Sequence, residues 1–233
     1  RLVGSEMCIR DSTRAALCTT FRILALSDQI DNGEAAAGAR DARRIAVMIN
    51  KYWTSIASTT CARDAIEVFG GNGTIEEFSI LPRLYRDAIV VESWEGTHNT
   101  LCAQVLRDFR SRQLHRPYLD GIRSEIETLD HPDLAAIADR AESLLAVAED
   151  RVEQLLAGRE LNANAHIRSV VDHLCRFTDW VALAGQLQWE RTWGVDADTA
   201  DVLELYRLQV LDRVDPQETP SLIDLHRRLS ESV

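Results

Sequence analysis

The sequence predicts an all-α protein: a helical bundle followed by a second, acidic helical extension. Apolar residues make up 45% and charged residues 27% of the 233 residues, and there are only 11 Gly and 5 Pro. This composition suits a helical protein with a buried core and is unlike that of a disordered chain or a β-sandwich. Apolar residues also recur at steps of three and four, which is the spacing of one helical face.

Two long helices are predicted before residue 70. The apolar residues between 13 and 30 follow the helical spacing, and the turn signal Asp31-Asn32-Gly33 ends that helix. A second run, from about 40 to 69, contains neither Gly nor Pro and implies a helix of roughly 45 Å at 1.5 Å per residue. The sequence GGNG at 70–73 ends this helix, because glycines permit positive φ.

A loop and a third helix are predicted next. We expect the loop to contain Pro82 and to lead to the pair Arg86-Asp87. The following helix should begin at Gly96-Thr97, with Thr97 as a candidate capping residue. We interpret the Arg86-Asp87 pair as structural, because adjacent opposite charges after a loop usually fix local structure through hydrogen bonds.

Beyond about residue 115 the sequence predicts acidic amphipathic helices, and we place a domain boundary there, between 13–115 and 116–233. Residues 1–110 carry 13 basic and 14 acidic groups, whereas residues 111–233 carry 13 and 23. Almost all of the formal net charge of −11 therefore lies in the second region. The helices expected in this region span roughly 117–129, 132–157, 165–192, 197–212 and 220–231.

Composition and charge argue against several classes of function. Binding to nucleic-acid phosphates needs clustered Lys and Arg, and the acidic second region opposes it. The sequence contains no run of eighteen apolar residues, so no membrane span is predicted. The five cysteines have neither CxxC spacing nor a His at metal-ligand distance, so we expect no metal site. Buried thiols in a reducing, cytoplasmic compartment are the favoured interpretation.

The first twelve residues, RLVGSEMCIRDS, are interpreted as non-native. The stretch LVGSEMCIRD resembles the translation of a transposase sequencing adaptor. Residues 1–12 are therefore not expected to be part of the native fold. On this interpretation the natural protein continues upstream and the chain is a fragment.

Motifs between Ala65 and Arg107 resemble the C-terminal domain of the acyl-CoA dehydrogenases. In order, the segment contains GGNG, RLYRD, a hydrophobic stretch and WEGT, followed by a predicted helix. Together with the sequence KYW at 51–53, it is most similar to the branch that includes the AidB-like adaptive-alkylation-response flavoproteins. The resemblance covers about residues 13–110.

The resemblance implies an FAD-dependent dehydrogenase that acts on acyl-CoA, passes electrons to a separate acceptor and forms a homodimer or homotetramer. Glu95 stands where the family has its catalytic base. Its carboxylate would take the α-proton of the thioester while the β-hydrogen leaves as hydride to the flavin. A positioned carboxylate suits this role because it can accept a proton during the reaction.

The resemblance also implies contacts for the neighbours of Glu95. Trp94 would line the acyl channel and Gly96 would sit beside the substrate. Thr97 and Asn99 would meet the flavin, although relatives often carry Gln at the position of Asn99. We expect His98 to be a surface residue without a partner.

The glycine loop is the second implied cofactor site. Gly70, Gly71 and Gly73 would contact the FAD of a neighbouring subunit, because backbone N–H groups approach a pyrophosphate closely only where no Cβ intervenes. Glu67 stands where relatives often have Gln. An ionised carboxylate there cannot donate a hydrogen bond to phosphate.

Two other classes of function remain open. An AidB-like role in nucleic-acid binding or protection would need basic surface, and the acidic second region argues against it. A helical assembly module would use the extension as an oligomer interface. In the family, an N-terminal helical domain and a β-domain supply most flavin and CoA contacts, so we expect the chain alone to be inactive.

Overall fold

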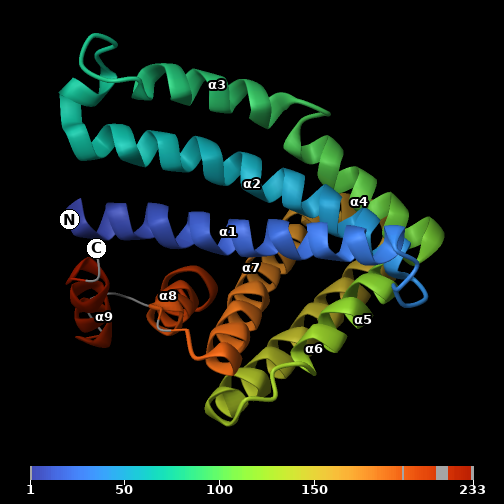
Figure 1. The fold of residues 1–233 in the computed structure, drawn as a ribbon. Coiled ribbons are helices and arrows are strands. Elements are labelled where there is room, and N and C mark those ends of the chain that lie inside the picture. Colours follow the sequence, from blue (N-terminus) through green and yellow to red (C-terminus); the bar gives the residue numbers. More distant parts are fainter. Residues whose placement is uncertain (1, 196, 214–219, 232–233) are drawn as a thin grey trace.

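The computed structural model describes residues 2–195, 197–213 and 220–231, and every regular element within these ranges is a helix. The all-α prediction is therefore confirmed. The long helices α1 (Leu2–Asp31) and α2 (Ala39–Phe69) run side by side (Figure 1). A short 3₁₀ helix, η1 (Gly70–Thr74), then leads to α3 (Leu81–Ser93), which returns along α2.

The remaining helices cover the other side of α1 and α2 (Figure 1). They agree with the expected helices to within a few residues at most ends. In chain order they are α4 (His98–Arg112), α5 (His115–Ile126), the 3₁₀ helix η2 (Pro132–Leu134), α6 (Ala135–Ala157), α7 (Glu160–Trp193), α8 (Thr199–Tyr206), the π-helical turn η3 (Arg207–Leu211) and α9 (Pro220–Glu231).

The prediction of a loop around Pro82 is wrong, because this segment forms α3. Pro82 lies in the first turn of that helix. There its missing N–H costs no hydrogen bond, since the first N–H groups of a helix have no partner within it. The Arg86-Asp87 pair is exposed on α3, where Arg86 contacts Glu76 at 2.6 Å and Asp87 contacts Arg83 at 3.7 Å.

Helix α7 lies at the centre of the core. It packs against α1, α2, α4, α5, α6 and α8, and every residue from 177 to 184 is buried. A helix that is covered all round needs apolar residues on all faces, which explains why this stretch lacks a polar stripe. Buried apolar residues on both sides of residue 115 belong to one continuous cluster.

Four of the five cysteines are free thiols, and two of them, Cys102 and Cys175, are buried. The side chain of Cys8 lies outside the described residues. Burial raises the pKa of the Cys102 thiol to about 11, so it stays protonated near neutral pH. In the part of the chain that the structure describes, no helix combines the length and apolarity that crossing a membrane requires.

One buried carboxyl, Asp179 of α7, ties four helices together. It accepts hydrogen bonds from the Thr19 hydroxyl at 2.5 Å, the Trp53 indole N–H at 2.8 Å and the Tyr206 hydroxyl at 3.2 Å. These donors come from α1, α2 and α8. Burial disfavours the charged form and raises the pKa of Asp179 from 3.8 to about 6, against the opposing effect of the three donors.

This raised pKa predicts a pH-dependent contribution to stability. The folded chain binds the Asp179 proton more tightly than the unfolded chain does, so the contribution is fully present below the unfolded pKa and is lost as pH rises through about 6. Asp179→Asn cannot titrate. We expect the difference in free energy of unfolding, wild type minus variant, to shrink by up to about 3 kcal/mol between pH 4 and 7. Urea unfolding across this range measures it, and a constant difference would contradict the prediction.

Candidate functional site

The WEGT turn, residues 94–97, joins α3 to α4 and holds the predicted base in an unusual backbone conformation. Glu95 has φ 65° and Gly96 has φ 126°. Positive φ at a residue other than Gly costs roughly 1 kcal/mol and is uncommon outside functional sites and turns. The side chain of Glu95 is exposed, and 65% of Trp94 is exposed. The turn therefore presents both side chains outward at the start of α4.

The first turn of α4 agrees with the predicted start of that helix. Thr97 is the N-cap residue, and its carbonyl accepts the first helical hydrogen bond, from Leu101 N, at 3.0 Å. The side-chain oxygen of Thr97 lies 3.1 Å from that of Thr100 instead of capping a backbone N–H. Asn99 is exposed in the same turn. The backbone N–H groups in the first turn of α4 therefore have no side-chain cap from Thr97, and they point toward the WEGT turn.

The expectation that His98 is a surface residue without a partner is wrong. Its side chain is only 18% exposed, and its Nε2 lies 3.1 Å from Glu92 Oε1. Its ring also meets the ring of Tyr52 edge to face, with the centroids 5.3 Å apart. The sequence could not indicate these contacts, because they join three different helices.

The glycine loop lies in η1, and its three glycines have different structural roles. Gly70 has φ 59°, which favours glycine for conformational reasons. Gly73 is buried, and a Cβ there would lie 2.4 Å from the carbonyl oxygen of Ile66. Gly71 has neither a positive φ nor any atom within 4 Å of a built Cβ. The fold therefore explains Gly70 and Gly73 but not Gly71.

The two predicted cofactor motifs lie at opposite ends of α3 (Figure 1). That helix has 13 residues, which at 1.5 Å per residue separates the glycine loop from the WEGT turn by about 20 Å. The residues from Trp94 to Asn99 are brought together at one end, and the three glycines at the other. Within one chain, the structure does not join the two groups into one pocket.

Apolar side chains are exposed along the same part of the molecule, and we refer to this set as the apolar α3 surface. An exposed apolar region of this extent usually marks a surface that contacts another protein part or a ligand. Its large exposed members are Phe69, Ile75, Phe78, Ile80, Leu84, Ile89, Val90, Val91 and Trp94.

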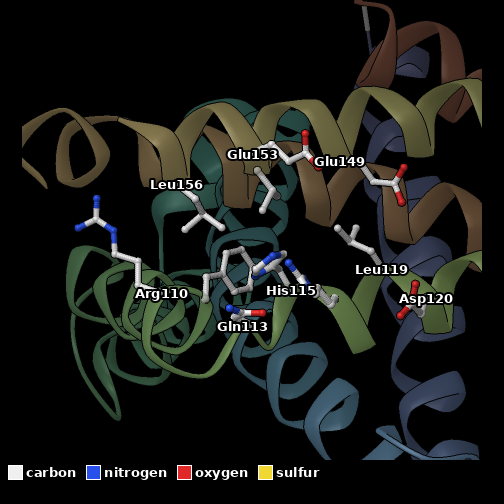
Figure 2. Close-up of a pocket in the computed structure, with 11 residues that line it drawn as sticks. Arg110, Gln113, His115, Leu119, Asp120, Glu149, Glu153 and Leu156 are labelled. Atoms are coloured by element: carbon white, nitrogen blue, oxygen red, sulfur yellow. The ribbon is translucent and has the colours of Figure 1, made fainter. Parts of the chain in front are cut away.

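A cavity of about 620 Å³ lies elsewhere, between the end of α4, α5 and α6 (Figure 2). Arg110 and Arg116 line it together with Glu149 and Glu153 of α6. His115, also in its wall, is 9% exposed, and burial together with the nearby Arg116 lowers its pKa. None of the predicted site residues lines this cavity, so we do not assign the predicted chemistry to it.

Comparison with known families identifies the segment that carries both motifs. Residues 12–109 match the family described as "Acyl-CoA dehydrogenase, C-terminal domain". This segment, which runs from α1 through most of α4, therefore belongs to that family. The resemblance drawn from GGNG and WEGT is confirmed.

Two curated proteins illustrate the relationship. Acyl-CoA dehydrogenase family member 11 of Caenorhabditis elegans is 31% identical over 101 residues, which are 43% of this chain and 16% of that protein. The putative acyl-CoA dehydrogenase AidB of Escherichia coli (strain K12) is 54% identical over 44 residues, which are 19% of this chain and 8% of that protein. The chain thus matches less than a fifth of the length of either relative.

Two solved structures share the fold. ACDH-11 of Caenorhabditis elegans, solved in complex with C11-CoA, superposes with a TM-score of 0.66 at 20% identity, covering 88% of this chain and 35% of that one. The Bd2924 apo-form superposes with a TM-score of 0.61 at 24% identity, covering 78% and 32%. Both superpositions extend beyond the 98 residues that match the family, so part of the fold outside residues 12–109 also has a counterpart.

Proposed function

We propose that this chain is part of an FAD-dependent acyl-CoA dehydrogenase and that Glu95 removes the α-proton of the acyl-CoA thioester. The observation that carries the proposal is the conformation of Glu95. A glutamate held at φ 65° exposes its carboxylate just before the N-terminus of α4, inside a segment that belongs to the acyl-CoA dehydrogenase C-terminal family. Strain at one polar residue in such a turn supports a functional role.

The residues around Glu95 suit proton abstraction next to a carbonyl. Removing the α-proton places negative charge on the thioester oxygen, and the amide groups at the start of α4 favour negative charge. Gly96, which has φ 126°, directly follows the base, and we assign it to the position beside the substrate. Trp94 offers an exposed apolar surface for the acyl chain. FAD, when bound, accepts the hydride from the β-carbon and so supplies the redox step.

The glycine loop fits close approach of a phosphate group. Gly70 and Gly71 are exposed, and a Cβ built at either would meet no atom within 4 Å. Because the loop lies about 20 Å from the WEGT turn, we assign it to the FAD of a neighbouring subunit, and Thr97 and Asn99 to the FAD beside Glu95. Because the two motifs are assigned to the FAD groups of different subunits, the assembly must be a homodimer or homotetramer. The exposed apolar α3 surface supports contact with another subunit or domain.

Gly71 offers the cleanest test of the cofactor contact. Because no other atom lies near its Cβ position, Gly71→Ala should leave the melting temperature of the full-length protein unchanged. The added methyl group would hinder a closely bound phosphate, so we expect less FAD to be retained per subunit after gel filtration. The matched control is Gly185→Ala in α7, where a Cβ also meets nothing within 4 Å. Full FAD retention in Gly71→Ala would contradict the assignment of the loop.

Two alternatives are weaker. An AidB-like role in nucleic-acid binding is supported by the 54% identity to AidB over 44 residues, but residues 111–233 carry 23 acidic and 13 basic groups. A role as an assembly module alone would assign no function to the exposed carboxylate of Glu95 in the WEGT turn. We place the enzyme in the cytoplasm on the basis of its cysteine pattern, and we assign its electrons to a separate protein acceptor.

A further inference from the structure

Two of the contacts made by α2 hold the residues just before the WEGT turn. The Lys51 ammonium donates to the carbonyl oxygen of Val91 at 3.1 Å, and the Thr59 hydroxyl donates to the Glu92 carboxylate. Lys51 and Thr59 are eight residues, or about two turns, apart along α2. The last turn of α3 is therefore fixed to α2.

A third contact holds the residue just after the turn. The Tyr52 ring packs at 87° against the ring of His98, the first residue of α4, whose Nε2 lies 3.1 Å from Glu92 Oε1. Glu92 and His98 therefore meet across the turn, three residues before and three residues after Glu95. This closed arrangement fixes both ends of the segment that carries the strained residue.

Tyr52 in turn is held by α7, in the acidic extension. Its hydroxyl donates to Asp172 Oδ1 at 2.5 Å and accepts from Arg168 Nε at 3.2 Å. Tyr52 is only 1% exposed, and burial with the Asp172 contact raises its pKa, so the hydroxyl remains a donor. Arg168 and Asp172 are one helical turn apart and meet at this single oxygen.

The same face of α7 also holds the neighbouring residue, Trp53. Its indole N–H donates to Asp179 at 2.8 Å, and Asp179 lies seven residues after Asp172, or about two turns along α7. Lys51 thus joins α2 to α3, whereas Tyr52 and Trp53 both join α2 to α7. Both Asp172 and Asp179 lie beyond residue 109, where the match to the dehydrogenase family ends.

We infer that Tyr52 and His98 are positioning residues for Glu95, and that α7 of the extension holds the WEGT turn in place through them. The contacts run from Asp172 and Arg168 to Tyr52, from Tyr52 to His98, and from His98 to Glu92. Without them, Glu95 is free to leave positive φ for the more favourable negative region. The catalytic consequence rests on the proposed function, whereas the mechanical link between α7 and the turn does not.

Tyr52→Phe is the first test, because it keeps the ring against His98 and removes the hydroxyl that binds α7. The matched control is Tyr118→Phe. Tyr118 is 2% exposed, and its hydroxyl lies 2.7 Å from Thr178 Oγ1, so this variant also loses one buried hydroxyl contact but at a different place. A second variant, Asp172→Ala, removes the acceptor from a partly exposed position and serves if Tyr52→Phe does not fold.

The first readout is backbone ¹⁵N relaxation of Glu95, Gly96 and Thr97 in the purified 233-residue chain. We expect order parameters typical of rigid backbone, about 0.85, in the wild type and Tyr118→Phe, and values below about 0.6 in Tyr52→Phe and Asp172→Ala. Unchanged order in both test variants would overturn the inference. This result is independent of catalysis.

The second readout is enzyme kinetics in the full-length flavoprotein. A misplaced base slows the chemical step without weakening substrate binding, so Tyr52→Phe should lower kcat by roughly 10- to 100-fold with little change in KM. Tyr118→Phe should change neither. A normal kcat in Tyr52→Phe overturns the positioning role alone if Glu95→Gln is inactive, and overturns the proposed function as well if Glu95→Gln is also active.

Discussion

Glu95→Gln is expected to slow flavin reduction by acyl-CoA in the full-length protein by roughly 10²- to 10⁴-fold, the usual contribution of a general base. Glutamine has nearly the same size and shape as glutamate, but its amide does not accept the α-proton. Flavin content and melting temperature should hardly change, because Glu95 is exposed and contributes little packing. Anaerobic single-turnover mixing, followed by flavin absorbance, measures the rate.

Glu77→Gln is a suitable control for this experiment. Glu77 is also exposed and lies in the loop between η1 and α3, away from the WEGT turn. We expect it to react at the wild-type rate. Retention of the wild-type rate by Glu95→Gln would show that another residue of the full-length protein is the base, and it would remove the main support for our assignment.

Asp179→Ala is expected to lower the free energy of unfolding of the chain by about 3 kcal/mol or more. The substitution leaves three donors, from Thr19, Trp53 and Tyr206, without their acceptor, and each unsatisfied buried donor costs roughly 1–3 kcal/mol. The effect should be larger at low pH and near its full size at pH 4, because the favourable contribution of this carboxyl is lost as pH rises through about 6. Urea unfolding at pH 4 measures it.

The control for this substitution is Asp28→Ala on the exposed side of α1. Exposed substitutions of this kind usually change stability by no more than about 0.5 kcal/mol. If Asp179→Ala has an equally small effect, Asp179 does not hold the four helices together, and another set of contacts must fix α8 against α1 and α2.

The predicted helices match the observed ones well where a long stretch of the sequence contains no helix-breaking residue. Residues 40–69 contain no Gly or Pro, and the observed α2 begins and ends within one residue of the expected helix. Helix α3 was missed because Pro82 was interpreted as a loop residue, although proline is also common in the first turn of a helix. A helix of 13 residues with such a start has a weak signal in a single sequence.

The candidate site was predictable only as a set of motifs. WEGT and GGNG located Glu95 and the glycines, but periodicity does not indicate which side chains from different helices meet. Tyr52 and Asp172 are 120 residues apart in the sequence and form a hydrogen bond of 2.5 Å. His98 was misinterpreted for the same reason. Such contacts depend on how α2, α4 and α7 pack, which no local pattern specifies.

The glycine loop has a consequence for the recognition of flavoproteins from sequence. Two of its glycines, Gly70 and Gly73, are needed for the chain to turn at the end of α2, whether or not a nucleotide binds there. On the proposed assignment of this loop to FAD, a descendant that had lost its flavin would still be under pressure to keep both. Only Gly71 would be free to acquire a side chain without cost to the fold. Among distant relatives with this turn, the residue at that one position should therefore report on cofactor loss better than the motif as a whole.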